Sequence, residues 1–344
     1  MKKVILVLFI IVVVVGCILG WMVFGSATTF EAKSKYVYAY DSLPPQPQIQ
    51  RQLLDSNFIK NVWLFNIIAD RMNVWSRLKP GRFEVQKGES LLDLARRLRN
   101  NEQAPARLVI NKLRTPNDLA RLIEKNFSTD SVHSLQFLTS NDSLKQLDVD
   151  TNTLMTLIIP DTYILNWSTP VKRILQRLAK EQDKFWHEDN RIAKADKMGF
   201  TPVQVYTLAS IVEEETNKND EKGNIASVYI NRFKKGMPLG ADPTIKFALK
   251  DFGLKRILYG HLQVASPYNT YRNTGLPPGP ICTPSEKTID AVLDAPNTNY
   301  LFFVARSDFS GYHHFSSTYA EHEQYARQYQ QALNERVAAQ QKAQ

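Results

Sequence analysis

The chain has 344 residues, of which 43% are hydrophobic, so it is long and apolar enough for two domains with their own cores. Its formal net charge of +9 favours an anionic partner. Because no C2H2 spacing, RNP motif or arginine-rich tract occurs, we expect this partner to be lipid or an acidic polymer and not nucleic acid. We expect no disulfide between Cys17 and Cys282, because Cys17 lies in a hydrophobic run. The histidines do not have the spacing of zinc ligands, so we expect no metal and no cofactor.

Residues 4–24 form an almost uncharged run that is long enough to span a bilayer. Lys2 and Lys3 precede the run, and the bulk of the chain follows it. We therefore expect residues 1–25 to be a cytoplasmic tip and single-pass anchor in the plasma (inner) membrane, with an extracytoplasmic or periplasmic body. Two alternatives stay open, a lipoprotein signal ending at Cys17 and a cleaved signal peptide, whose apolar core is normally shorter.

Short elements follow in residues 26–114, with strands expected at 35–40, 82–85 and 107–110 and helices at 48–58, 62–73 and 91–99. Ser90 is the expected N-cap of the last helix. The stretch RFEVQKGESLLDLARRL, residues 82–98, resembles a LysM-like α/β module, a strand followed by a helix after a short turn. That resemblance implies contact with glycan, and a purely structural role is the alternative.

Between residues 115 and 199 we expect a helix after Thr115, several short helices over 131–155, a long helix over 169–187 and then a polar segment. Asp161 follows a hydrophobic strand within the sequence PDTY. It is a candidate for the wall of a cleft, and a turn-forming Asp after Pro160 explains it equally well.

A helix begins after Thr201, because Thr201 and Gln204 form a capping box and Pro202 occupies the first helical position. The apolar stripe of this helix recurs at spacings of three and four, over Val205, Leu208, Val212 and then Glu215.

Of the run Glu213-Glu214-Glu215, only Glu215 continues the buried stripe. Poor solvation and the negative end of the helix dipole both disfavour its charged form, which raises the expected pKa of the carboxyl. A carboxyl protonated near neutral pH is what a general acid requires. The alternative is a solvated acidic helix end.

A second helix over 222–235 places Asn231 and Arg232 near its end, where they either reach a cleft or face solvent. Asp242-Pro243 is expected to form a turn. The Pro- and Gly-rich residues 266–283 are predicted to be a long functional loop, either a glycan groove or a structural lid. Tyr rings pack on sugars and Asn amides bond their hydroxyls, which makes four residues candidates, Tyr268, Asn269, Thr270 and Tyr271.

The C-terminal region is expected to hold a helix capped by Thr283 and Glu286, a hairpin of strands 300–305 and 312–315, and a last helix after Thr318.

Several motifs together, ASIVEEET, ASVYINR, ADPT and YNTY-x-x-TGLPPG, resemble the MltG/YceG-like endolytic murein transglycosylases in their order and spacing. The catalytic residue of that family is the second Glu of an E-x-E-T motif, which is Glu215 here. Substrate-binding positions implied by the resemblance or by the loop chemistry are Glu213, Asn231, Arg232, Asp242, Tyr268, Asn269, Thr270, Tyr271, Pro277, Pro278, Asp161 and, in a G-x-H-x-F-like element, His314.

The resemblance implies an α+β catalytic domain over residues 115–344 and cleavage of peptidoglycan glycan strands without water. Glu215 would protonate the glycosidic oxygen and then act as base on the muramyl 6-hydroxyl, giving 1,6-anhydro ends and terminating glycan elongation. Peptidoglycan-synthesis proteins are implied as further partners. Two other functions stay open, a hydrolase that uses Glu215 with Asp242, and a non-catalytic glycan-binding scaffold protein.

Overall fold

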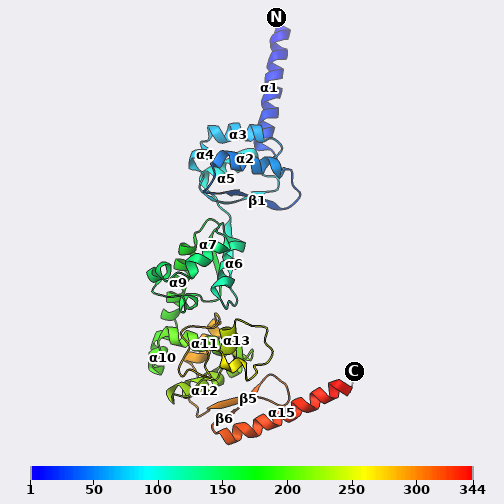
Figure 1. Ribbon diagram of the computed structural model, residues 1–344. Coiled ribbons are helices and arrows are strands. Elements are labelled where there is room, and N and C mark those ends of the chain that lie inside the picture. The colour runs from blue at the N-terminus through cyan, green and yellow to red at the C-terminus, as the bar shows by residue number, and fades with distance from the viewer. Residues whose placement is uncertain (1, 343–344) are drawn as a thin grey trace. The chain divides into compact units, whose positions relative to one another are not determined.

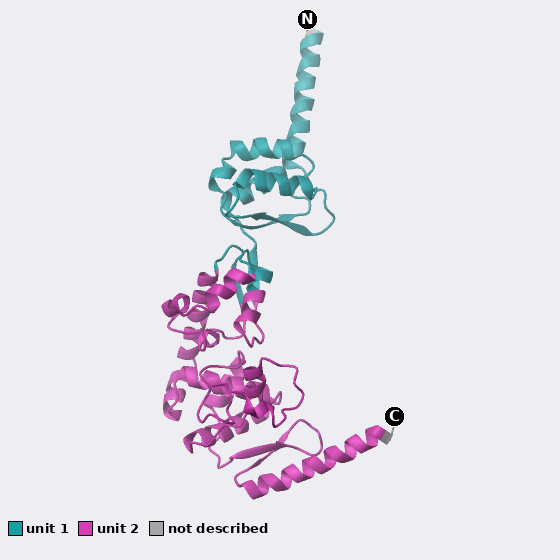
Figure 2. Cartoon of the chain, in the orientation of Figure 1, with its two compact units in different colours: residues 1–108, 123–130, 163–170 teal, residues 109–122, 131–162, 171–344 magenta. Residues whose placement is uncertain are grey.

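The computed structural model describes residues 2–342, which fall into two compact units (Figures 1 and 2). Unit 1 is formed by residues up to 108 together with 123–130 and 163–170, and unit 2 by 109–122, 131–162 and 171 onward. Met1, expected at the cytoplasmic tip, and residues 343–344 of the expected catalytic domain lie outside the described residues. The fold is mixed α+β, as the sequence predicts.

Unit 1 contains an apolar N-terminal helix, a two-stranded sheet and four further helices: α1 (Lys2–Phe24), β1 (Ser34–Ala39), α2 (Pro45–Asp55), α3 (Val62–Arg71), α4 (Val74–Arg77), β2 (Gly81–Gln86) and α5 (Leu91–Asn100). Within residues 2–342, α1 is the one helix long and apolar enough to cross a membrane. β1 and β2 pair antiparallel with Val37 opposite Phe83, and both side chains are fully buried in a core shared with the helices. Ser90 caps α5 by accepting the backbone N–H of Asp93, as expected.

The two strands β3 (Pro105–Val109) and β4 (Thr162–Asn166) form a second small sheet. The elements of the middle of the chain are α6 (Pro116–Asn126), α7 (Ser131–Leu138), α8 (Asn141–Leu144), η1 (Lys145–Leu147), η2 (Leu154–Leu157), α9 (Val171–His187) and α10 (Arg191–Met198). The remaining elements are α11 (Pro202–Glu215), η3 (Asn219–Glu221), α12 (Lys222–Lys234), α13 (Asp242–Leu249), η4 (His261–Gln263), α14 (Glu286–Leu293), β5 (Phe302–Ala305), β6 (His313–Ser316) and α15 (Tyr319–Lys342).

Helix α11 is the centre of unit 2. Its N-terminus has the predicted capping box, with Thr201 accepting from the backbone of Gln204 and the Gln204 side chain accepting in return. Residues 205–212 are all buried, because α12, α13 and α14 pack around the helix. The core is therefore wider than the single apolar stripe that the sequence indicates.

Three expectations about local structure were wrong. The polar segment before α11 contains helix α10, which packs because Arg191 bonds Asp290 through two nitrogens at 2.7 and 3.1 Å. Asp242 begins helix α13 instead of a turn, since the burial of Ile245 one turn later stabilises the helix. The N-cap of α14 is Ser285 and not Thr283, and it makes no side-chain capping bond.

Candidate active site

Glu213 points from the end of α11 toward α12 and α14. Lys222 Nζ donates to its Oε2 at 3.0 Å, Ser285 Oγ donates at 3.1 Å, and the Thr288 hydroxyl also donates to this oxygen. Burial opposes ionisation of this carboxyl, but the bonds from Thr288 and Lys222 outweigh it and lower the pKa of Glu213. Glu213 is thus an ionised cross-link between three helices.

Glu214 points to the segment that precedes α6. Arg114 donates to both of its oxygens, from Nε at 3.2 Å and Nη2 at 3.0 Å, and Lys112 Nζ lies 3.3 Å from Oε1. A two-pronged guanidinium–carboxylate pair fixes geometry as well as charge. Glu214 is therefore held as an ion-paired carboxylate.

Glu215, the last residue of α11, lines a pocket of about 590 Å³. Tyr229 on α12 donates its hydroxyl proton to Oε1 at 2.5 Å, and within residues 2–342 only this oxygen of the carboxyl has a protein hydrogen-bond partner. Burial raises the pKa of Glu215 to about 7, the bond from Tyr229 counteracts the rise, and the negative charge of Asp242 adds to it. This group can give and take a proton near neutral pH.

The other walls of this pocket come from α12, α13, the loop 266–283 and the C-terminal elements, and its lining residues are Glu215, Tyr229, Arg232, Met237, Pro238, Leu239, Gly240, Asp242, Tyr271, Phe303 and His322. Tyr271 donates to Asp242 Oδ1 at 2.6 Å, which joins the loop to the first turn of α13. Arg232 donates to the carbonyls of Leu301 at 2.6 Å and Leu239 at 2.7 Å, and burial lowers its pKa.

Four of the sequence-predicted site residues therefore meet in this pocket, namely Glu215, Arg232, Asp242 and Tyr271. No set of three or more His, Cys, Asp or Glu side chains in the described part of the chain is arranged to hold a metal ion. The lining side chains offer a protonatable carboxyl, a second carboxylate, a guanidinium, two phenols and the imidazole of His322.

Three further predicted residues lie behind the pocket wall and hold it in place. Asn231 Nδ2 donates to the carbonyls of Thr298 and Tyr300, both at 2.9 Å. Asn269 is fully buried, and its amide bonds the backbone of its own loop, including Tyr271 N at 3.0 Å. Thr270 is buried as well and accepts from the backbone N–H of Ala241 at 3.0 Å, just before α13.

The remaining predicted residues do not line the pocket. Tyr268 packs its ring on Phe247 at a centroid distance of 4.6 Å. Pro277 is buried, Pro278 and Asp161 are exposed, and Asp161 accepts from the backbone of Thr162 as a turn residue would. His314 stacks on Tyr325 of α15 with centroids 4.2 Å apart.

Sequence reasoning missed Tyr229, Phe303 and His322 as pocket residues, and also the segment 237–240. Tyr229 could have been predicted from the sequence, because it is a side chain with a polar tip on the apolar face of α12, where a buried hydroxyl needs a hydrogen-bond partner. Phe303 of β5 and His322 of α15 could not have been predicted, since their place in the pocket wall depends on how the C-terminal hairpin packs.

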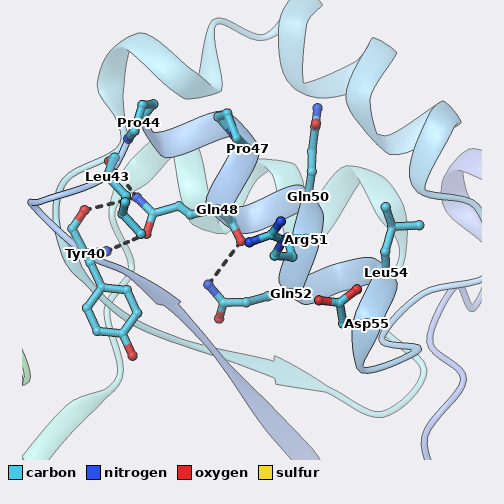
Figure 3. A pocket seen from close by; sticks show the side chains of 10 residues that line it. All are labelled: Tyr40, Leu43, Pro44, Pro47, Gln48, Gln50, Arg51, Gln52, Leu54 and Asp55. Atoms are coloured by element: carbon cyan, nitrogen blue, oxygen red, sulfur yellow. Dashed lines mark hydrogen bonds between the residues drawn. The ribbon is translucent and has the colours of Figure 1, made fainter.

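Unit 1 contains a separate pocket of about 740 Å³ beside α2 (Figure 3). Gln48 on α2 bonds the backbone of Tyr40 and Leu43, so its amide already has partners within the fold. Arg51 and Asp55 also line this pocket. Residues 82–98, the LysM-like stretch, contribute nothing to its lining.

Comparison with known proteins agrees with this architecture. A model of the YceG-like family matches residues 37–328. An endolytic murein transglycosylase of Bacillus subtilis is 36% identical over 183 residues, or 52% of this chain and 49% of that protein. One of Streptococcus pneumoniae strain D39 is 26% identical over 318 residues, or 82% of this chain and 57% of that protein. The chain thus spans about half the length of the curated relatives it matches.

A crystal structure of a yceG-like protein from Listeria monocytogenes superimposes with a TM-score of 0.56 at 26% sequence identity. The alignment covers 85% of this chain and 98% of that one. The similarity therefore extends through most of the described fold and is not confined to the pocket.

Proposed function

This chain belongs to the YceG-like family, and on that premise we propose that it is a membrane-anchored endolytic lytic transglycosylase that cleaves the MurNAc–GlcNAc bond within peptidoglycan glycan strands. One observation carries the proposal. The carboxyl of Glu215 lines a pocket, and its pKa of about 7 suits a group that must first donate a proton and then accept one.

In the proposed reaction Glu215 gives its proton to the glycosidic oxygen while the bond from that oxygen to C1 of the muramyl residue breaks. The resulting carboxylate then takes the proton of the muramyl 6-hydroxyl, and the hydroxyl oxygen bonds to C1. The product end is a 1,6-anhydro ring, and no water is consumed. Because the substrate supplies its own nucleophile, one carboxyl is sufficient, and a cut within a growing strand ends its elongation.

The other pocket side chains are proposed to bind and orient sugar. Tyr271 is 38% exposed, so one ring face is available to pack on the C–H face of a saccharide. Asp242 and Arg232 are proposed to bond sugar hydroxyls. Asn269 and Thr270 are proposed to act through the backbone positions that they fix, as positioning residues.

We place α1 across the plasma (inner) membrane with its N-terminus in the cytoplasm, because Lys3 precedes the apolar run and the rest of the chain follows it. Residues 26–114 then precede the catalytic domain of residues 115–344, and peptidoglycan-synthesis proteins are the proposed protein partners. For the LysM-like stretch we favour the structural role, since the apolar face of α5 is used in the core of unit 1.

A second candidate function is hydrolysis, because Asp242 lies in the same pocket and a pair of carboxylates is the usual equipment of a glycosidase. Digestion of isolated glycan strands in water enriched in oxygen-18 separates the two reactions. A transglycosylase gives unlabelled anhydro ends, a hydrolase gives labelled reducing ends, and a scaffold protein gives no cleavage.

The variant that tests the assignment is Glu215→Gln, which keeps the shape of the side chain but cannot transfer a proton. Turnover should fall by at least the ~10²–10⁴-fold typical of a lost general acid–base, because one residue serves both steps. Glu214→Gln is the neighbouring control, since that residue is paired with Arg114 outside the pocket lining, and it should lower turnover far less than Glu215→Gln. Glu213→Gln should cost less activity than Glu215→Gln. A folded Glu215→Gln protein with near-normal activity would show that the acid lies elsewhere.

A further inference from the structure

Helix α1 enters unit 1 without a linker. Met22 and Val23, in its last turn, pack against the core of unit 1. Gly25 N donates to the carbonyl of Trp21 at 2.8 Å, and Ala27 N donates to the carbonyl of Glu89 at 3.0 Å. The apolar helix is thus fixed to the folded unit within a few residues of Trp21.

The anchor also has no surplus length. The apolar run from Val4 to Phe24 extends about 31 Å at the ~1.5 Å rise per residue of an α-helix, against ~30 Å for the hydrocarbon core of a bilayer. If α1 spans the membrane, as the proposed function has it, the whole run is needed to cross. Trp21, one turn before the end of this run, then lies at the membrane interface, and the part of unit 1 around it lies there too.

The start of α3 is tied to this base of α1. Lys60 N donates to the carbonyl of Ala27 at 2.8 Å, and Lys60 Nζ donates to the carbonyl of Ser26 at 3.0 Å. The same ammonium lies 5.9 Å from the centre of the Trp21 ring. In Figure 1, α3 lies on the side of unit 1 from which α1 leaves. The first turn of α3 is therefore close to the depth of Trp21.

One face of α3 is uncovered, and it is apolar over its first two turns, before the exposed Asp70 follows on the same face. Trp63 is 72% exposed, and Ile67, one turn further on the same face, is 39% exposed. The opposite face, with Leu64 and Phe65, is buried in the core of unit 1. Single exposed apolar residues are common, but Trp beside an anchor is typical of the membrane interface.

We propose that α3 lies on the bilayer surface as a second membrane contact, with Trp63 and Ile67 inserted at the level of the lipid headgroups. The inference rests on α1 being a membrane anchor. The molecule that covers this face of α3 is lipid, because the face begins close to the point where the anchor leaves the bilayer. The exposed guanidinium of Arg71, at the other end of α3, suits the phosphate groups of lipids.

Quenching of tryptophan fluorescence by brominated lipid tests the anchor and the contact of α3 with lipid separately. The full-length protein is reconstituted in vesicles of phosphatidylcholine and phosphatidylglycerol, with or without phosphatidylcholine brominated near the glycerol end of its acyl chains. Bromine quenches only the indoles that it contacts. Trp63→Phe leaves Trp21 as the interfacial indole, and Trp21→Phe leaves Trp63. Trp75→Phe is the matched control, because the Trp75 indole bonds Asp70 within unit 1 at 2.6 Å.

We expect quenching of both single variants, no loss of quenching in Trp75→Phe, and no quenching when Trp21 and Trp63 are both replaced. If Trp63→Phe protein is quenched and Trp21→Phe protein is not, α3 does not touch lipid, although the anchor stands. If neither single variant is quenched, the anchor itself is refuted, and the contact of α3 with lipid is refuted along with it.

Discussion

Replacement of Glu215 by Gln should stabilise the protein at alkaline pH even as it removes activity. The pKa of this carboxyl is about 7 in the folded chain against an ordinary value of 4.5. As pH rises, the unfolded chain therefore loses this proton first, and the free energy of unfolding falls through this window. At 1.36 kcal/mol per pKa unit, the loss reaches about 3 kcal/mol once both states are ionised.

The side chain of Glu215→Gln does not titrate and still offers an oxygen to the hydroxyl of Tyr229. The free energy of unfolding of the variant should therefore be close to that of the wild type at about pH 4 and exceed it by as much as ~3 kcal/mol at about pH 8. The measurement is urea denaturation of the full chain in detergent, followed by circular dichroism, at a series of pH values.

Glu213→Gln is the control variant, because its effect on the free energy of unfolding should have the opposite sign. The pKa of Glu213 is lowered in the folded chain, so its charge contributes stability above its ordinary pKa, which is lost as pH falls. This variant should be destabilised at neutral pH and approach the wild type in acid. If the stability gain of Glu215→Gln is absent at alkaline pH, or does not shrink toward acid pH, the carboxyl is not held protonated by its environment.

Three other variants probe the same site. Tyr229→Phe removes a bond that lowers the pKa of Glu215, so the alkaline limb of the pH–activity profile should move to higher pH. Asp242→Asn removes a charge that raises this pKa, so the limb should move to lower pH with turnover largely kept, whereas a two-carboxylate hydrolase would lose turnover altogether. Tyr271→Ala should raise KM for glycan strands while urea unfolding stays cooperative; an unchanged KM would remove this ring from the site, and a collapse of stability would make the loop a structural lid.

The sequence predicted those features that depend on neighbours along the chain. The start of α11 follows from Thr201, Pro202 and Gln204, because a capping box is completed within one turn. The position of Glu215 at the end of a buried stripe follows from helix periodicity alone. The same local reasoning gave the cap of α5 and the antiparallel pair β5–β6.

What the sequence did not predict depends on contacts between distant segments. The role of Asn269 illustrates this, because an Asn in a loop suits a sugar as well as it suits a backbone, and only the burial of its amide decides between them. Helix α10 was missed because its polar sequence gains stability from Arg191 bonding Asp290, a residue 99 positions away. Asp242 began a helix partly for a local reason, because Pro243 and an acidic side chain both suit the first turn of a helix, and partly because Ile245 is buried one turn later.

The three consecutive glutamates show how local and distant information combine in this site. Helix periodicity turns them toward three different neighbourhoods, which the sequence reveals. Which one keeps its proton depends on the surroundings of each carboxyl. Thr288 and Lys222 hold Glu213 ionised, and Arg114 pairs with Glu214. Burial favours the protonated form of Glu215, which meets Tyr229 and the acidic Asp242. The charge of Glu214 itself raises the pKa of Glu215. Glu214 therefore does more than pair with Arg114, because its charge also favours the protonated form of the carboxyl that is proposed to be the acid.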